Sequence, residues 1–175
     1  MLMIRTVRQS DYSAVSDLIR TAFSKTANGY RHEAELVDKI REDPTYQKRL
    51  EVVAENGVQL VGHGLLSEIR VVDGDTSATG LALAPLAVAP AVQKSGVGGL
   101  IIGELDNRAI KLGYKFIVVT GWPDYYPKFG YQKASQFGIK SPMPVPDDVF
   151  MAKPLIDGGL DGIHGTVQYL KAFDM

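Results

Sequence analysis

The sequence contains no cysteine among its 175 residues. This absence excludes disulfide bonds, thiolate metal sites and a cysteine nucleophile, and it is typical of proteins in a reducing compartment. An excess of charge is also missing, because 19 lysines and arginines stand against 20 aspartates and glutamates. Without a field of one sign, the chain is not expected to bind nucleic acid or a membrane surface.

Long hydrophobic runs are lacking as well. No apolar stretch reaches the roughly 20 residues that a membrane-spanning helix needs, and the apolar start is too brief for a signal-peptide core. We therefore expect a cytoplasmic protein. A hydrophobic content of 45% over this length can build one core but is short for two, so we predict a single domain over residues 1–175.

Periodic apolar residues predict three helices. The first follows the capping residues Ser10 and Asp11, and its apolar face is formed by Val15, Leu18, Ile19, Ala22 and Phe23. The second covers roughly residues 32–41, with Pro44 just beyond its end. The third covers residues 98–112 and is followed by Gly113, which suits a left-handed C-terminal cap.

Apolar and β-branched runs predict strands near residues 3–7, 51–55, 58–72, 79–88, 115–120 and 151–156. Asn56 and Gly57 favour a tight hairpin between the second and third of these. Pro85 suggests an irregularity inside the fourth strand. The order strand, glycine-rich turn, helix and strand over residues 79–120 is that of a parallel βαβ unit.

The turn inside this unit is the most informative stretch, and it consists of Gln93, Lys94, Ser95, Gly96, Val97, Gly98 and Gly99. A helix start presents unpaired backbone N–H groups and the positive end of the helix dipole. Glycines there remove the side chains that would keep a phosphate at a distance. The stretch therefore predicts an anion-binding site.

Two familiar nucleotide loops do not fit these letters. The dinucleotide fingerprint G-x-G-x-x-G, started at Gly96, requires a glycine where Ile101 stands. The nucleoside-triphosphate loop requires Gly-Lys-Ser or Gly-Lys-Thr, and the sequence has neither. A glycine-rich turn without a ligand remains the alternative on spacing alone.

Residues 93–98 have the form Q/R-x-x-G-x-G/A, which resembles the acetyl-CoA loop of the GNAT superfamily of N-acyltransferases. Residues 125–131, with the letters YYPKFGY, resemble the second landmark of that family, Y-x-x-F/L-G-F/Y. The tail around residues 145–151 and 165–169 is similar to the YhbS-like subgroup, so the resemblance covers nearly the whole chain.

The resemblance implies an α/β (α+β) fold with a mixed, mostly antiparallel sheet of six or seven strands and helices on both faces. Two adjacent parallel strands, here those ending at Val88 and Thr120, are expected to splay apart and form the cleft for acetyl-CoA. The pantetheine arm would pair with Leu86, Ala87 and Val88, and the pyrophosphate would bind residues 93–99. Lys94 stands where arginine is common and offers a point charge instead of a fork.

Acyl transfer to an amine needs an oxyanion donor, an acid for the departing thiolate and a base for the amine. The backbone N–H of Val88 or its neighbour is the candidate donor, and Tyr126 occupies the tyrosine position of the family and is the candidate acid. Glu68 stands where some members place an acidic residue near the amine, although a strand Glu is more often solvated. His63 is another candidate to line the cleft, although a lone histidine is more often structural. No metal site is expected.

These features predict an N-acetyltransferase that moves an acetyl group from acetyl-CoA to a primary amine by direct attack in a ternary complex. The alternative is a sensor module that binds acyl-CoA without turnover, and a ligand-free interaction domain would leave the glycine-rich turn unexplained. The expected partner is a small-molecule or peptide amine, with acetyl-CoA as co-substrate and a homodimer as an option. The sequence does not name the acceptor.

Overall fold

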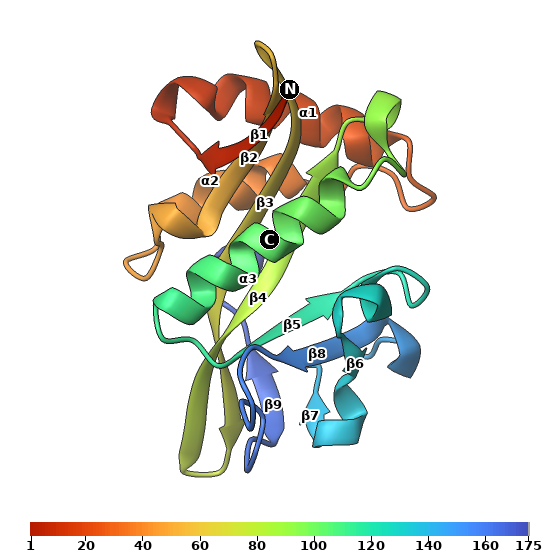
Figure 1. Cartoon of the computed structure of the whole chain (residues 1–175). Helices are drawn as coiled ribbons and strands as arrows, with labels where there is room; N and C mark the ends of the chain where they lie inside the picture. The colour runs from red at the N-terminus through yellow and green to blue at the C-terminus, as the bar shows by residue number, and fades with distance from the viewer. Residues whose placement is uncertain (175) are drawn as a thin grey trace.

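The strands form one twisted sheet that carries helices on both faces (Figure 1). The computed structural model describes residues 1–174, and within them the sheet has nine strands. The strands are β1 (Leu2–Thr6), β2 (Glu51–Asn56), β3 (Gln59–Asp73), β4 (Thr76–Val88), β5 (Phe116–Thr120), β6 (Gln132–Lys133), β7 (Ile139–Lys140), β8 (Phe150–Pro154) and β9 (Gly165–Gln168). The helices are α1 (Tyr12–Ser24), α2 (Glu33–Arg41) and α3 (Val97–Lys111).

The strand order is β1-β2-β3-β4-β5-β8-β6, and β9 pairs with both β3 and β7. All pairs are antiparallel except β4 with β5 and β7 with β9. The mixed, mostly antiparallel sheet is therefore confirmed. It has more strands than the expected six or seven, because β6 and β7 are two-residue strands that carry no readable periodicity.

The alternation of side chains along β2 separates two cores. Val52 and Ala54 face α3, and Val53 between them faces α1 and α2. Figure 1 shows the same layering, with α3 across one face of the sheet and α1 and α2 on the other. A third cluster of buried apolar residues fills the part of the molecule around β5, β8 and β9. The apolar helix faces predicted from the sequence are therefore the faces that are buried.

The hairpin predicted at Asn56 and Gly57 is present between β2 and β3. Gly57 has a φ of 69°, which glycine adopts without steric cost. Both β3 and β4 are long. Beyond the end of β2, residues Arg70 to Val72 of β3 pair with β9 instead. The long β3–β4 hairpin consequently links the two halves of the molecule (Figure 1).

The βαβ unit β4–α3–β5 is confirmed, and β4 carries the expected irregularity. Gly64 of β3 pairs with Leu86, but Leu66 pairs with Leu83, so β4 has one extra residue at this point. Such a bulge bends a strand and increases its local twist. It lies in the part of β4 that leads to the glycine-rich turn.

Candidate functional site

The parallel strands β4 and β5 separate toward their carboxyl ends. They pair only at Leu81 with Ile117 and at Ala82 with Val118. The six residues of β4 from Leu83 to Val88 extend past this pairing, so their edge is not covered by β5. The structure thus contains the opening between splayed strands that the resemblance implied.

The exposed edge of β4 presents backbone groups to this opening. The Ala89 N–H donates to the carbonyl of Val61 in β3 at 2.8 Å, so the backbone polar groups of Ala89 face β3. Because successive residues of a strand turn their polar groups to opposite edges, Val88 and Leu86 direct theirs to the opening. The side chain of Gln93 donates to the Val88 carbonyl at 3.0 Å and ties the following turn to this edge.

The turn before α3 has the geometry of an anion site. Lys94 and Gly96 both have positive φ values, 66° and 92°, which orient neighbouring backbone N–H groups toward one side. The first bond within the helix runs from the Leu100 N–H to the Gly96 carbonyl at 3.1 Å. The N–H groups of Val97, Gly98 and Gly99 therefore have no acceptor within the helix. A side chain at Gly96 would project into open space, so this side of the turn is accessible to a ligand.

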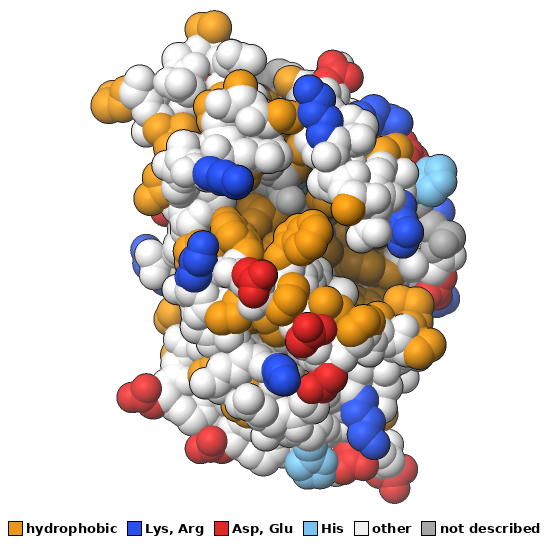
Figure 2. All heavy atoms as spheres, turned by 90° about the vertical axis from the view of Figure 1, so that its right-hand side faces the viewer, with side chains coloured by type: hydrophobic (Ala, Val, Ile, Leu, Met, Phe, Trp, Pro, Cys, Tyr) orange, Lys and Arg blue, Asp and Glu red, His pale blue; other side chains and the backbone are white. Residues whose placement is uncertain are grey.

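The opening and the turn lie on the same side of the molecule, at the right of Figure 1. Viewed from that side, the surface is hollowed, and hydrophobic side chains line the hollow (Figure 2). An apolar cleft that ends at an anion-binding turn matches a ligand with a pyrophosphate and a long, weakly polar arm.

Residues 3–134 match the acetyltransferase (GNAT) domain. The chain belongs to this family. Among curated GNAT proteins, the uncharacterized N-acetyltransferase YhbS of Escherichia coli is 28% identical over 173 residues, which cover 99% of both chains. The uncharacterized N-acetyltransferase YjhQ of Escherichia coli is 31% identical over 141 residues, covering 80% of this chain and 75% of YjhQ.

Solved GNAT structures extend the comparison to the bound cofactor. The crystal structure of YhbS from Escherichia coli in complex with CoA superposes with a TM-score of 0.88 at 26% identity, covering 99% of this chain and 92% of that chain. A GNAT acetyltransferase from Brucella melitensis in complex with acetyl-CoA gives a TM-score of 0.81 at 27% identity, with 99% of each chain covered. The resemblance inferred from the two sequence landmarks is therefore confirmed.

Tyr126 lies in the wall of the opening just beyond β5. Its ring packs on Gly121, where a Cβ would lie 2.4 Å from the ring. The ring also meets Tyr125 and Tyr131 edge-on, with centroids 5.0 and 5.6 Å away. The side chain is 9% exposed, and burial raises its pKa well above the ordinary tyrosine value. Its hydroxyl consequently keeps its proton at neutral pH.

Tyr125 reaches the anion-binding turn. A Cβ built on Gly98 would lie 2.2 Å from the Tyr125 hydroxyl and 3.7 Å from the Val88 side chain. The absence of a side chain at Gly98 is thus required by Tyr125 as well as by any phosphate. The two adjacent tyrosines thus pack in different directions, Tyr126 on Gly121 just after β5 and Tyr125 against the start of α3.

This contact predicts a stability effect. Gly98→Ala should destabilise the protein by about 1–3 kcal/mol, because the new methyl group overlaps the Tyr125 hydroxyl. Tyr125→Phe should recover part of the loss in a double-mutant cycle measured by urea unfolding. Gly103→Ala is the control, because nothing lies within 4 Å of its Cβ position in the same helix. The control should stabilise by about 0.5–1 kcal/mol, and equal losses at both glycines would refute the contact.

The structure does not bring Glu68 into the opening. Glu68 pairs with Leu81, and Leu81 lies where β4 and β5 are still joined. Its carboxylate accepts a hydrogen bond from the Tyr114 hydroxyl at 2.6 Å, near the C-terminal end of α3. Burial, followed by this bond, raises the pKa of Tyr114 to about 12. Glu68 thus lies where the strands are still joined, and its role as base stays a prediction. Sequence spacing alone did not reveal where the strands separate.

A buried polar cluster beneath β4 was not predicted as a unit. Glu51 of β2 and His63 of β3 are both fully buried, and His63 Nε2 lies 2.8 Å from a Glu51 oxygen. Arg41 donates to both Glu51 oxygens, at 3.1 and 2.6 Å, and the Tyr46 hydroxyl donates at 2.6 Å. The guanidinium of Arg41 also lies 3.6 Å from the ring centroid of Tyr12. The cluster joins α1 and α2 to the sheet.

The glycines on either side of His63 serve the packing of α3. A Cβ at Gly62 or Gly64 would lie 2.7 or 2.6 Å from the Ile101 side chain. These glycines therefore allow α3 to pack closely on the opposite face of β3. Gly62 and Gly64 face α3, while the side chain of His63 points to the face of the sheet covered by α1 and α2.

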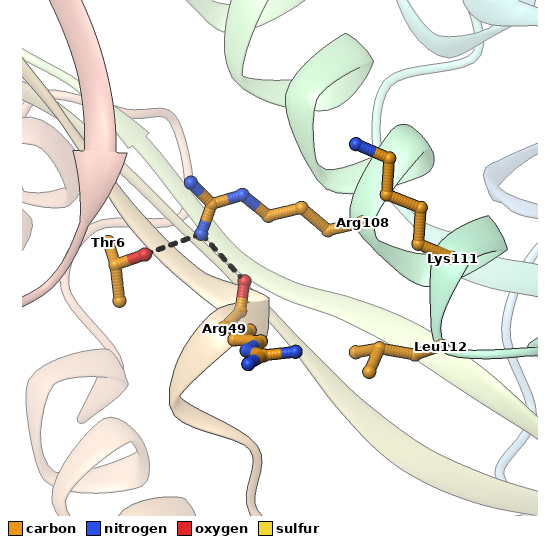
Figure 3. Close-up of a pocket in the computed structure, with 5 residues that line it drawn as sticks. All are labelled: Thr6, Arg49, Arg108, Lys111 and Leu112. Carbon is orange, nitrogen blue, oxygen red and sulfur yellow. Dashed lines mark hydrogen bonds between the residues drawn. The ribbon is translucent and has the colours of Figure 1, made fainter.

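A cavity of about 300 Å³ lies at the other end of α3 and is lined by Thr6, Arg49, Arg108, Lys111 and Leu112. Figure 3 shows Arg108 donating to the Thr6 hydroxyl at 2.7 Å and to the Arg49 carbonyl at 3.0 Å. Arg108 also binds Glu104 at 2.7 Å. Cations near a helix C-terminus interact favourably with the helix dipole, so the basic residues here stabilise α3. The bond from Arg108 to Thr6 also links α3 to β1. This cavity is remote from the cofactor turn.

Within residues 1–174, no helix has the length and apolar character needed to cross a membrane. In the same residues, no three histidine, aspartate or glutamate side chains are grouped in a way that would hold a metal ion.

Proposed function

We propose that this GNAT protein transfers an acetyl group from acetyl-CoA to a primary amine by direct attack in a ternary complex. The observation that carries the proposal is the coincidence of three features at one end of the sheet. These are the uncovered edge of β4 from Leu83 to Val88, the anion-binding turn before α3 and a protonated tyrosine at the β5 wall.

The residues of the turn would hold the coenzyme. Unpaired N–H groups at the start of α3 and the charge of Lys94 would bind the pyrophosphate. The edge of β4 at Leu86, Ala87 and Val88 would pair with the pantetheine arm as an added strand does. The relatives crystallised with CoA and with acetyl-CoA support this assignment of the cleft.

The chain also supplies groups for the chemistry. The Val88 N–H, directed to the opening, would stabilise the oxyanion that forms when the amine attacks the thioester carbon. The Tyr126 hydroxyl would give its proton to the departing sulfur as the carbon–sulfur bond breaks. Because its pKa is raised by burial, Tyr126 remains a proton donor throughout the range in which a free amine is available.

A charge placed in the turn tests the coenzyme assignment. Ser95→Glu should weaken acetyl-CoA binding about 10- to 100-fold relative to Ser95→Gln, because only the former adds a negative charge beside the pyrophosphate. Both variants lose the same hydroxyl contact to the Val92 carbonyl. A negative charge before a helix favours the fold, so Ser95→Glu should not be less stable than Ser95→Gln. Equal affinities by calorimetry would show that the pyrophosphate binds elsewhere.

Turnover itself is tested by release of free thiol from acetyl-CoA in the presence of amines, amino acids and peptides. The expected result is acetylation of at least one primary amine, verified by the mass of the product. Binding of acetyl-CoA without turnover on any acceptor would favour the sensor alternative over the enzyme.

A further inference from the structure

The Glu51–His63 pair is a buried ionisable pair that the proposed mechanism does not yet use. Burying charged groups costs several kcal/mol of desolvation, and such pairs seldom add net stability. Their occurrence beside a candidate active site therefore calls for a functional explanation. One atom of the pair stands out, because His63 Nδ1 is buried and has no hydrogen-bond partner in the described structure.

The hydrogen bonds fix the protonation pattern of the ring. Burial alone would raise the pKa of Glu51, but hydrogen bonds from His63 and Arg41 outweigh it and lower the pKa to about 2. An ionised carboxylate only accepts hydrogen bonds, so His63 Nε2 must carry the hydrogen that it shares with Glu51. In the neutral ring Nδ1 then holds a free lone pair, which makes it a proton acceptor.

The strand register places His63 beside the strand that borders the opening. His63 is paired with Ala87 of β4, and paired residues of antiparallel strands project from the same face. Ala87 belongs to the segment of β4 whose outer edge is open. The ring of His63 therefore lies one strand inward from that edge, and its neighbour toward the edge carries a single methyl group. Adjacent strands lie about 4.8 Å apart, so proton transfer between the ring and that edge requires a relay such as water.

We propose that His63, oriented by Glu51, is the base that accepts a proton from the acceptor amine through a water molecule at the open edge of β4. The inference rests on the proposed acetyl transfer. It assigns to Glu51 the role of a positioning residue that holds the ring and stabilises the imidazolium, as an aspartate does in a catalytic triad.

The proton count closes with these two groups. A protonated amine loses two protons when it becomes an amide. His63 receives one of them before the nitrogen lone pair attacks the thioester carbon, and returns it to solvent. As the carbon–sulfur bond breaks, Tyr126 gives its proton to the departing sulfur. The second amine proton replaces the one that Tyr126 has lost and returns the tyrosine to its starting state. No oxidant, metal or further reactant is required.

The charged and titratable groups around His63 are those of the cluster. Glu51 from β2 bonds to the ring, while Arg41 from α2 and Tyr46 from the following loop bond to Glu51. Tyr12 from α1 stacks on Arg41. Arg41 neutralises Glu51, and the carboxylate at 2.8 Å stabilises the ring once it accepts a proton.

His63→Gln tests the proposal, because the glutamine amide can replace Nε2 as donor to Glu51 but cannot take a proton. We expect kcat/KM to fall about 10²-fold at pH 8 with acetyl-CoA affinity and melting temperature retained. The ratio of wild-type to variant kcat/KM should fall as the pH rises toward the pKa of the acceptor amine, because an amine that is already free needs no base. A ratio that is independent of pH would assign His63 a purely structural role.

The matched control is His164→Gln. This histidine is exposed and pairs with Asp73 at the tip of the β3–β4 hairpin, so its replacement should leave kcat/KM unchanged at every pH. If the wild-type protein acetylates no amine, the proposed function fails and this role fails with it. An active enzyme with a pH-independent ratio overturns the role of His63 alone.

A spectroscopic measurement on the wild-type protein avoids any effect of the substitution on folding. The sequence has three histidines, so ¹⁵N spectra of the histidine-labelled protein bound to CoA are readily assigned. We expect a bare Nδ1 and a protonated Nε2 on His63 at pH 8, the tautomer that the bond to Glu51 requires. A protonated Nδ1 at pH 8 would refute the assignment.

Discussion

Replacing Tyr126 with phenylalanine should lower kcat about 10²- to 10⁴-fold, the range typical of a lost general acid. The ring packs between Gly121, Tyr125 and Tyr131, and phenylalanine preserves all of these contacts. Stability and acetyl-CoA affinity should consequently change little. The measurement is steady-state kinetics with an identified amine, together with calorimetric titration of acetyl-CoA. A loss confined to kcat would identify the hydroxyl as the group that acts on the reacting atoms.

Tyr125→Phe is the control for this experiment, since it removes a hydroxyl from the adjacent ring. That hydroxyl lies against Gly98 at the start of α3, so its loss should affect acetyl-CoA binding and leave kcat near the wild-type value. Full turnover by the Tyr126→Phe protein would show that the thiolate receives its proton from another donor. A large kcat loss in Tyr125→Phe alone would exchange the roles of the two tyrosines.

Replacing Glu51 with glutamine should destabilise the fold by about 3–5 kcal/mol, because it leaves the charge of Arg41 without its buried partner. Glu51 is fully buried, and 9% of the Arg41 side chain is exposed. The free energy of unfolding from urea titrations at pH 7 measures the effect. Asp38→Asn is the matched control, because Asp38 pairs with the same arginine at 3.4 Å but is 72% exposed. Its loss should remain below about 1 kcal/mol.

Glu51 also predicts how stability depends on pH. Its folded-state pKa of about 2 lies below the ordinary value of 4.5, so the unfolded chain binds the proton more readily. The contribution of Glu51 is therefore complete above about pH 5 and declines as the pH falls toward 2. The Glu51→Gln protein should show a flatter acid limb than the wild type. Parallel acid limbs would mean that Glu51 is not ionised in the folded protein.

The fold was largely readable from the sequence where local chemistry fixes it. Gly57 needs a positive φ, and the glycine-rich turn before α3 carries the letters of an anion site, so the hairpin and the βαβ unit were predictable. The turn around Gly96 was assigned to the coenzyme for the same reason. Strands β6 and β7 were not predictable, because two residues that pair across the sheet leave no periodic pattern.

The candidate catalytic side chains were harder to place, because their environment depends on the register of the strands. Glu68 has the right chemistry for a base, but the pairing of Leu81 with Ile117 keeps it out of the opening. Glu51 and His63 lie 12 residues apart in the sequence and meet only because the β2–β3 pairing sets Val53 opposite His63. No spacing rule on one sequence reveals such a diagonal contact.

The placement of β9 has a consequence for the order in which the chain folds. The β3–β4 hairpin and the βαβ unit that follows it are built from neighbouring segments, so they can form early. Strand β9 must instead return across the molecule to pair Val167 with Val71. The entropy cost of closing this long loop makes the pairing slow. Until the pairing forms, the backbone N–H and C=O groups of β3 from Arg70 to Val72 are unpaired and can bind a strand of another chain. Newly made chains should therefore be most prone to aggregate in the interval before β9 docks.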